Sequence, residues 1–203
     1  MRLCRNHVFN PWKDPASLVK ANITPDQKHK ADPVNPFSAA DLKTSFVKIL
    51  LLALGKTDEP YLQKGLDIYL NRIPHYLPFE MKIIPDIRNT RKLTEEQQKE
   101  KEGALLLQQT TPADEVILLD EKGSVKSSVE FARFLEKKML AGNKRLIFMI
   151  GGPYGFSKDV YERANNQISL SKMTFSHQMV RLLFVEQLYR ACTIIKGEPY
   201  HHT

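Results

Sequence analysis

A glycine-rich turn follows an apolar run in the C-terminal third of this chain. Residues Leu146 to Ile150 are typical of a buried strand, and they lead directly into Gly151-Gly152-Pro153-Tyr154-Gly155. Glycine is required where the backbone adopts a positive φ or approaches a ligand more closely than a Cβ allows. The turn matches neither the G-x-G-x-x-G pattern of dinucleotide sites nor the phosphate loop G-x-x-x-x-G-K-[ST]. It therefore indicates either a plain tight turn or a site where backbone groups bind a ligand.

Cationic and aromatic residues near the C-terminus supply a second set of candidate groups. Arg181 and Arg190 lie on a segment with helical spacing of apolar residues, about two and a half turns apart, so they do not share one stripe. The chain ends in Tyr200-His201-His202-Thr203. Adjacent histidines lack the i, i+4 spacing of a helical metal pair, and Cys4 and Cys192 offer neither metal spacing nor a disulfide framework. We therefore expect no metal site.

Several common chemistries lack their motifs. The sequence contains no nucleophile elbow, C-x-x-C pair or phosphate loop, which argues against hydrolase, thiol-redox and P-loop functions. A glycine turn and a tail bearing Arg, His and Tyr fit group transfer from a cofactor. The formal charge of +7 is compatible with nucleic-acid binding, but many other proteins share such a charge. The cations of residues 88–92 belong either to a solvated loop or to an RNA-backbone contact.

Apolar runs and helix-start signals alternate from Val47 onward. We expect strands at 47–54, 79–84, 115–119 and 146–150. A helix capped by Thr57 or Asp58 should extend to about Asn71. Capping-box patterns at Thr94 and Ser127 should open two more helices, of which the first ends near Gln109. Another helix should begin near Gln178 and bury a mostly apolar side formed by Val180, Leu183, Phe184, Gln187, Leu188 and Ala191.

This succession of strands and helices predicts an α/β fold with a parallel sheet covered by helices on both faces. Ligands of such sheets bind outside the carboxyl ends of the strands. The loops after Leu119 and Ile150 should consequently form the walls of one pocket, together with part of the last fifty residues.

Residues 1–46 differ from the rest of the chain. They contain five prolines, scattered polar residues and no sustained apolar period, so we expect them to be disordered or a non-native extension of a single domain at 47–203. They have neither the apolar core of a secretory signal nor the composition of a transit peptide. No apolar run is long enough to cross a bilayer. We expect a soluble protein of the reducing cytoplasm.

Several motifs from Leu119 onward resemble those of the bacterial large-subunit rRNA pseudouridine N3-methyltransferases, a family of the SPOUT class. The segments that carry the resemblance are Leu119–Gly123, Phe148–Gly155, Ser171–His177, Val180-Arg181, Glu186–Ala191 and Pro199–His202. Their order and spacing are family-like, and the resemblance extends from about Val47 to the C-terminus. Residues 1–46 have no counterpart in it, which makes an alternative start codon near Val47 plausible.

The resemblance implies a parallel-rich sheet with a C-terminal trefoil knot, one of the rare exceptions to the rule against threaded chains. It also implies a homodimer whose knots lie at the interface, and S-adenosylmethionine as the cofactor. The implied reaction is methylation of N3 of a pseudouridine in 23S ribosomal RNA, on the ribosome. The residues that it implies for cofactor binding are Leu119, Gly152, Ser171, Lys172, Met173, Thr174, Phe175 and Ser176.

The chemical problem in such a reaction is the proton on N3, since the methyl donor already carries an activated sulfonium. His201, or alternatively His177, would accept that proton, with water as a third acceptor. Arg190 would stabilise the anionic base or hold a phosphate, and Tyr200 would stack or form a hydrogen bond. Two other functions stay open: methylation of another RNA base, in tRNA or small-subunit rRNA, and a non-catalytic RNA-binding or ribosome-assembly factor.

Overall fold

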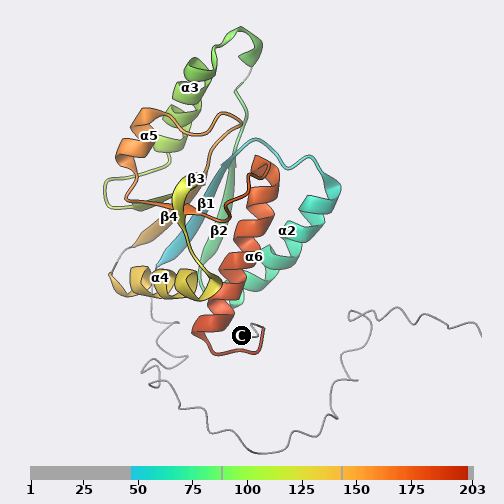
Figure 1. The fold of residues 1–203 in the computed structure, drawn as a ribbon, viewed down its shortest axis with the longest axis vertical. Helices are drawn as coiled ribbons and strands as arrows, with labels where there is room; N and C mark the ends of the chain where they lie inside the picture. Colours follow the sequence, from blue (N-terminus) through green and yellow to red (C-terminus); the bar gives the residue numbers. More distant parts are fainter. Residues whose placement is uncertain (1–46, 88, 143, 201–203) are drawn as a thin grey trace, which may run out of the picture. The chain divides into compact units, whose positions relative to one another are not determined.

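Strands and helices alternate along residues 47–87, 89–142 and 144–200, which are the residues that the computed structural model describes (Figure 1). The expectations for residues 1–46 and for His201 lie outside these ranges. The strands are β1 (Lys48–Leu54), β2 (Phe79–Ile84), β3 (Glu115–Val125), β4 (Arg145–Ile150) and β5 (Asn166–Ser169). The helices are α2 (Pro60–Arg72), α3 (Glu95–Leu107), α4 (Ser128–Leu140), α5 (Lys158–Arg163) and α6 (His177–Ile195), with 3-10 turns η1 (Ile73–His75) and η2 (Thr90–Lys92).

The strands form one five-stranded sheet in the order β2-β1-β4-β3-β5. Every neighbouring pair is parallel, which confirms the predicted sheet. The sequence pattern missed β5, because this strand is short and begins with two polar residues. The pattern missed the short helix α5 as well. It also ended β3 too early, since the strand continues past Leu119 to Val125.

Helices cover both faces of the sheet, as predicted (Figure 1). Alternate β1 residues point to opposite cores: Ile49 and Leu51 pack with α2, α4 and α6, whereas Leu50 and Leu52 pack with α3 and α5. Such alternation follows from the two-residue period of a strand, and burial on both faces explains why β1 is apolar from Ile49 to Leu54. Among the described residues, no helix is both long enough and apolar enough to span a membrane.

Two of the predicted helix N-caps are confirmed and one is wrong. Thr94 and Ser127 each cap a helix through a complete capping box, as predicted. The predicted cap of α2 at Thr57 or Asp58 is wrong, because the helix begins at Pro60 with Glu59 as its N-cap. Proline suits the first helical position, since its fixed φ is already helical and the missing N–H has no helical partner there.

The backbones of β3 and β5 approach each other closely at Ile168. Ile168 is the register partner of both Leu119 and Ser124, so the four residues between them bulge around β5. A Cβ built on Gly123 would lie 2.5 Å from the backbone nitrogen of Ile168. Glycine at position 123 is therefore what lets the two backbone segments pass each other.

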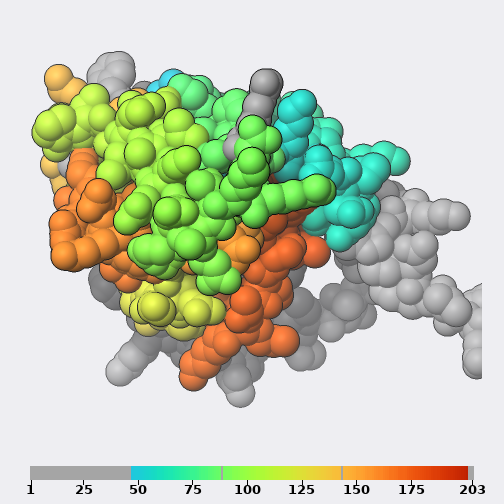
Figure 2. Space-filling model, turned by 90° about the horizontal axis from the view of Figure 1, so that it is seen from above, coloured from blue at the N-terminus to red at the C-terminus, as the bar shows by residue number. Residues whose placement is uncertain are grey.

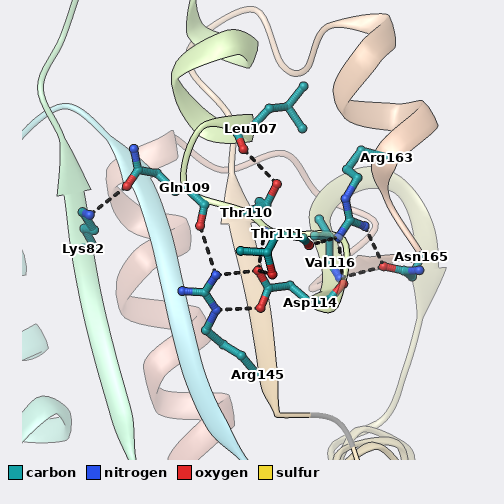
Figure 3. A network of polar contacts seen from close by, with 10 residues as sticks. All are labelled: Lys82, Leu107, Gln109, Thr110, Thr111, Asp114, Val116, Arg145, Arg163 and Asn165. Carbon is teal, nitrogen blue, oxygen red and sulfur yellow. Dashed lines mark hydrogen bonds and ion pairs between the residues drawn. The ribbon is translucent and has the colours of Figure 1, made fainter.

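The amino ends of the central strands are joined by a polar network (Figure 3). Arg145 donates from Nε and Nη2 to the two carboxylate oxygens of Asp114, at 2.7 and 2.5 Å. Thr111 donates to the same carboxylate, while Arg163 donates to the carbonyl oxygen of Asp114 at 2.8 Å. The hydrogen bonds from Arg145 lower the pKa of Asp114 to about 2. This edge of the sheet is thus held by a paired, hydrogen-bonded carboxylate.

Candidate active site at the carboxyl ends of the strands

A pocket of about 410 Å³ opens at the carboxyl edge of the sheet, within the size range of small-molecule sites. Three segments form most of its walls. They begin at Leu119 in β3, at the last residue of β4 and at the last residue of β5. The lining residues are Leu119, Asp120, Glu121, Ile150, Gly151, Gly152, Pro153, Ser169, Leu170, Ser171, Met173, Thr174, Phe175, Ser176, His177 and Val180. Figure 2 looks onto the end of the molecule where α3 begins, and its green surface borders the orange surface of the C-terminal third.

The pocket gathers the residues that the sequence assigned to a cofactor, with one exception. Leu119, Gly152, Ser171, Met173, Thr174, Phe175 and Ser176 all line it. Lys172 does not line the pocket, and its side chain is exposed. The prediction that the loops after Leu119 and Ile150 share one pocket is confirmed.

Sequence reasoning left several lining residues unassigned. Gly151 precedes Gly152 and Leu170 precedes Ser171, and both of these neighbours were assigned to the cofactor. Their position beside assigned residues could therefore have marked Gly151 and Leu170 as pocket residues. Asp120 and Glu121 belong to a motif that was recognised, but no site role was drawn from them. Their membership of the pocket follows from the bulge in β3, which the strand pattern did not predict.

Side-chain hydroxyl groups hold the segment between β5 and α6 in shape. The Ser169 hydroxyl donates to the carbonyl oxygen of Ser171 at 2.7 Å, and the Ser171 hydroxyl accepts from the backbone N–H of Met173 at 2.9 Å. Ser176 caps α6 by accepting from the N–H of Met179 at 3.3 Å. The turn is therefore ordered by its own polar groups, while Met173 stays 72% exposed and offers an apolar contact at the pocket.

Gly152 lines the pocket and also lies against a side chain of α3. A Cβ at this position was expected to fill space needed by the ligand. In the structure it would lie 2.2 Å from Oε2 of Glu102, a buried residue of α3. The glycine thus makes room for a carboxylate behind the pocket wall.

The Glu102 carboxyl group is only partly satisfied. Its Oε1 accepts from Gln98 at 2.8 Å, but Oε2 has no hydrogen-bond partner among the described residues. Burial raises the pKa of Glu102, the hydrogen bond from Gln98 opposes this, and the charge of Asp86 adds to the rise.

Arg181 lies buried next to the other wall of the pocket. Its Nη1 donates to the Thr57 hydroxyl at 2.9 Å and its Nη2 donates to the Leu54 carbonyl oxygen, but Nε has no partner among the described residues. Burial and the charge of Arg181 lower the pKa of His177, which lines the pocket at the first position of α6. His177 is therefore biased toward the neutral form that can accept a proton.

The predicted catalytic residues Arg190 and Tyr200 form a separate cluster. Arg190 donates to the Glu186 carboxylate from Nη2 at 2.6 Å, and the Tyr200 hydroxyl donates to the same oxygen at 3.3 Å. The Arg190 guanidinium lies 4.8 Å from the centre of the Tyr200 ring. Neither residue lines the pocket, since thirteen helical positions between His177 and Arg190 correspond to roughly 20 Å along α6.

The described residues contain no group of three or more His, Cys, Asp or Glu side chains that could hold a metal ion. Cys192 is buried, and burial raises the pKa of its thiol to about 12, so it is poorly suited to act as a nucleophile. The site is accordingly a pocket of backbone, hydroxyl, apolar and carboxylate groups.

An α/β fold with a pocket at the carboxyl edge of its parallel sheet is typical of small-molecule-binding proteins, and similarity to known proteins identifies the family. Residues 47–201 match the family model described as "Predicted SPOUT methyltransferase". This chain belongs to the SPOUT methyltransferase family.

Individual relatives carry a more specific name. Ribosomal RNA large subunit methyltransferase H of Parabacteroides distasonis is 57% identical over 156 residues, which cover 77% of this chain and 99% of that protein. The proteins of the same name from Bacteroides fragilis and Flavobacterium psychrophilum are 54% and 58% identical, with the same coverage. The family match begins at residue 47, where the domain described above begins.

Proposed function

We propose that this chain methylates N3 of a pseudouridine in 23S ribosomal RNA on the ribosome, with S-adenosylmethionine as the methyl donor. The observation that carries the proposal is the pocket in which the Leu119–Gly123, Phe148–Gly155 and Ser171–His177 motifs of the resemblance converge, in a chain more than half identical to large-subunit rRNA methyltransferases. Since its substrate is the ribosome, we assign the protein to the cytoplasm.

The pocket residues suit such a donor. Leu119 and Ile150 offer apolar contacts for an adenine, and the ordered turn between β5 and α6 offers backbone groups for its edge. When bound, S-adenosylmethionine supplies a methyl group on a positively charged sulfur. The buried carboxyl of Glu102 behind Gly152 fits a cationic ligand, because its Oε2 has no other partner among the described residues.

We assign the acceptor side to His201, Tyr200 and Arg190, with Arg190 held in place by Glu186. These groups orient the base and deal with the proton on N3. His177 is the alternative proton acceptor, since it lines the pocket and its pKa is lowered by burial and by Arg181.

A homodimer accounts for the distance between the pocket and the cluster of Arg190 and Tyr200. Because Arg190 and Tyr200 lie toward the far end of α6 from the pocket of their own chain, they would serve the pocket of a second copy. Exposed apolar side chains at Met173 and Phe175 fit an interface beside the pocket. We further propose a C-terminal trefoil knot, which membership of the SPOUT family implies.

The test is methyl transfer from labelled S-adenosylmethionine to ribosomes from a strain that lacks the enzyme, with tRNA and small subunits in parallel. We expect transfer to 23S RNA alone, at N3 of a pseudouridine. Transfer to tRNA or small-subunit RNA would favour another RNA base as substrate. Binding to ribosomes without transfer would favour an assembly factor.

A further inference from the structure

Two buried side-chain atoms of the described residues lack a hydrogen-bond partner, and both border the pocket end of the sheet. They are Nε of Arg181 and Oε2 of Glu102. An orphaned buried polar atom is costly and calls for an explanation. Glu102 is only 6% exposed, and the ideal Cβ position of the pocket residue Gly152 lies 2.2 Å from its Oε2. The carboxylate is therefore aimed at the wall of the pocket.

The two carboxylates that line the pocket, Asp120 and Glu121, differ from Glu102 in their surroundings. Asp120 is engaged through both oxygens, since Oδ1 accepts from the Lys122 N–H at 2.7 Å and Oδ2 accepts from the Tyr161 hydroxyl at 2.6 Å. Glu121 is exposed, so solvent and salt screen its charge. Glu102 alone among these three combines burial with an unpartnered oxygen.

We propose that Glu102 is the counter-charge for the sulfonium of the bound methyl donor and acts through the Gly152 turn. The inference rests on the proposed function, in which S-adenosylmethionine occupies this pocket. The donor carries a positive charge on sulfur that the demethylated product, S-adenosylhomocysteine, lacks. A buried carboxyl group behind the pocket wall makes the pocket prefer the donor over the product, because its ionised form, which burial disfavours, gains a partner only while the cation is present.

The geometry separates this role from simple packing. Glu102 and Gln carry side chains of the same shape, and the Oε1 contact with Gln98 needs only an acceptor, which the amide of a glutamine retains. Glu102→Gln therefore removes the charge and leaves the volume behind Gly152 unchanged. Glu100→Gln is the matched control, because it removes the same charge from the exposed side of the same helix.

The experiment is calorimetry of wild type, Glu102→Gln and Glu100→Gln with three ligands. These are S-adenosylmethionine, S-adenosylhomocysteine and sinefungin, whose amino group carries a positive charge near the position of the sulfonium. We expect Glu102→Gln to lose about tenfold in affinity for the two charged ligands and less than about twofold for the neutral product. Glu100→Gln should bind all three as the wild type does.

If Glu102→Gln loses affinity equally for all three ligands, Glu102 has only a packing role and the counter-charge proposal is overturned. Unchanged affinities for all three ligands would overturn the proposal as well. If Glu102→Gln does not fold, Gln98→Leu provides the second variant. Removing the hydrogen bond to Oε1 disfavours the ionised carboxyl, so the preference for charged ligands should fall in the same direction, and an unchanged preference would contradict the inference. A wild-type protein that binds none of the ligands would refute the proposed cofactor itself, a result distinct from binding without discrimination.

Discussion

The two edges of the sheet differ in how completely their buried polar groups are hydrogen-bonded. At the amino edge, the Asp114 carboxylate accepts from Arg145 and Thr111, and Arg163 ties the neighbouring backbone (Figure 3). At the carboxyl edge, Glu102 and Arg181 each keep one buried atom without a partner. Both edges belong to the same sheet, so the difference lies in the side chains that the surrounding helices, strands and loops place there.

The contrast indicates where stability and function reside. A fully paired carboxylate contributes to folding, whereas an unpaired buried group costs stability, and we have proposed that a ligand compensates the one on Glu102. If this account is right, changes at the amino edge should affect unfolding and leave ligand affinity intact, and changes at the carboxyl edge should do the reverse.

The largest effect is expected at the amino edge. Asp114→Ala should lower the free energy of unfolding by about 3 kcal/mol at neutral pH, because it leaves the Arg145 guanidinium without its carboxylate. Urea unfolding measures the loss. Since the folded pKa of Asp114 is about 2 and lies below the unfolded value, the wild-type advantage should shrink as the pH falls below about 4. A weaker affinity of the folded variant for S-adenosylmethionine would contradict the claim that the amino edge affects stability alone.

The next effect concerns the acceptor side. His201→Ala should reduce single-turnover methyl transfer by about 100-fold, in the range of general acid–base effects, with cofactor affinity nearly unchanged. Arg190→Ala should also lower transfer, and Arg133→Ala is the control because Arg133 is an exposed cation on α4. Wild-type transfer by His201→Ala would eliminate it as the base and leave His177 or water. A parallel loss of cofactor affinity would mean that the tail closes the cofactor pocket.

A smaller effect tests the neighbour of Gly152. Gly152→Ala should weaken S-adenosylmethionine binding by about tenfold, since the new Cβ would displace the Glu102 carboxylate. Combined with Glu102→Gln it should cost little more than either change alone, because both act through the same group. Fully additive losses in calorimetry would instead place the Cβ against the ligand itself.

The smallest effect is expected from removing residues 1–46. The family match begins at residue 47, and the sequence before it has no sustained apolar pattern. A chain that starts at Val47 should dimerise, bind cofactor and methylate ribosomes at close to the full-length rate. Thermal unfolding and calorimetry of both lengths provide the comparison, and loss of cofactor binding in the shorter chain would show that the segment belongs to the functional unit.

Much of the fold could be predicted from local sequence. The apolar runs and the two capping boxes located β1, β2, β4, α3 and α4, because buried parallel strands and helix caps have strong local signals. The strand β5 and the bulge in β3 were missed, since a short polar-headed strand is fixed by its partner rather than by its own composition.

The site was predictable only where backbone motifs mark it. Leu119, Gly152 and the turn before α6 were found through the motifs that they share with the family. Glu102 was not, because a glutamate in a highly charged helix looks like a solvated residue, and only the packing of α3 against Gly152 reveals its burial. Arg181 was noticed as a cation, but its contacts with Leu54 and Thr57 depend on tertiary structure.

The contrast between the two edges can be measured directly by hydrogen exchange with and without S-adenosylmethionine. The account predicts that the ligand protects backbone amides of residues 119–121, 150–152 and 169–176 at the carboxyl edge. Amides of residues 109–116 and 163–166 at the amino edge should exchange as before. Protection confined to the amino edge, or none at the pocket segments under saturating ligand, would contradict the assignment of this pocket to the methyl donor.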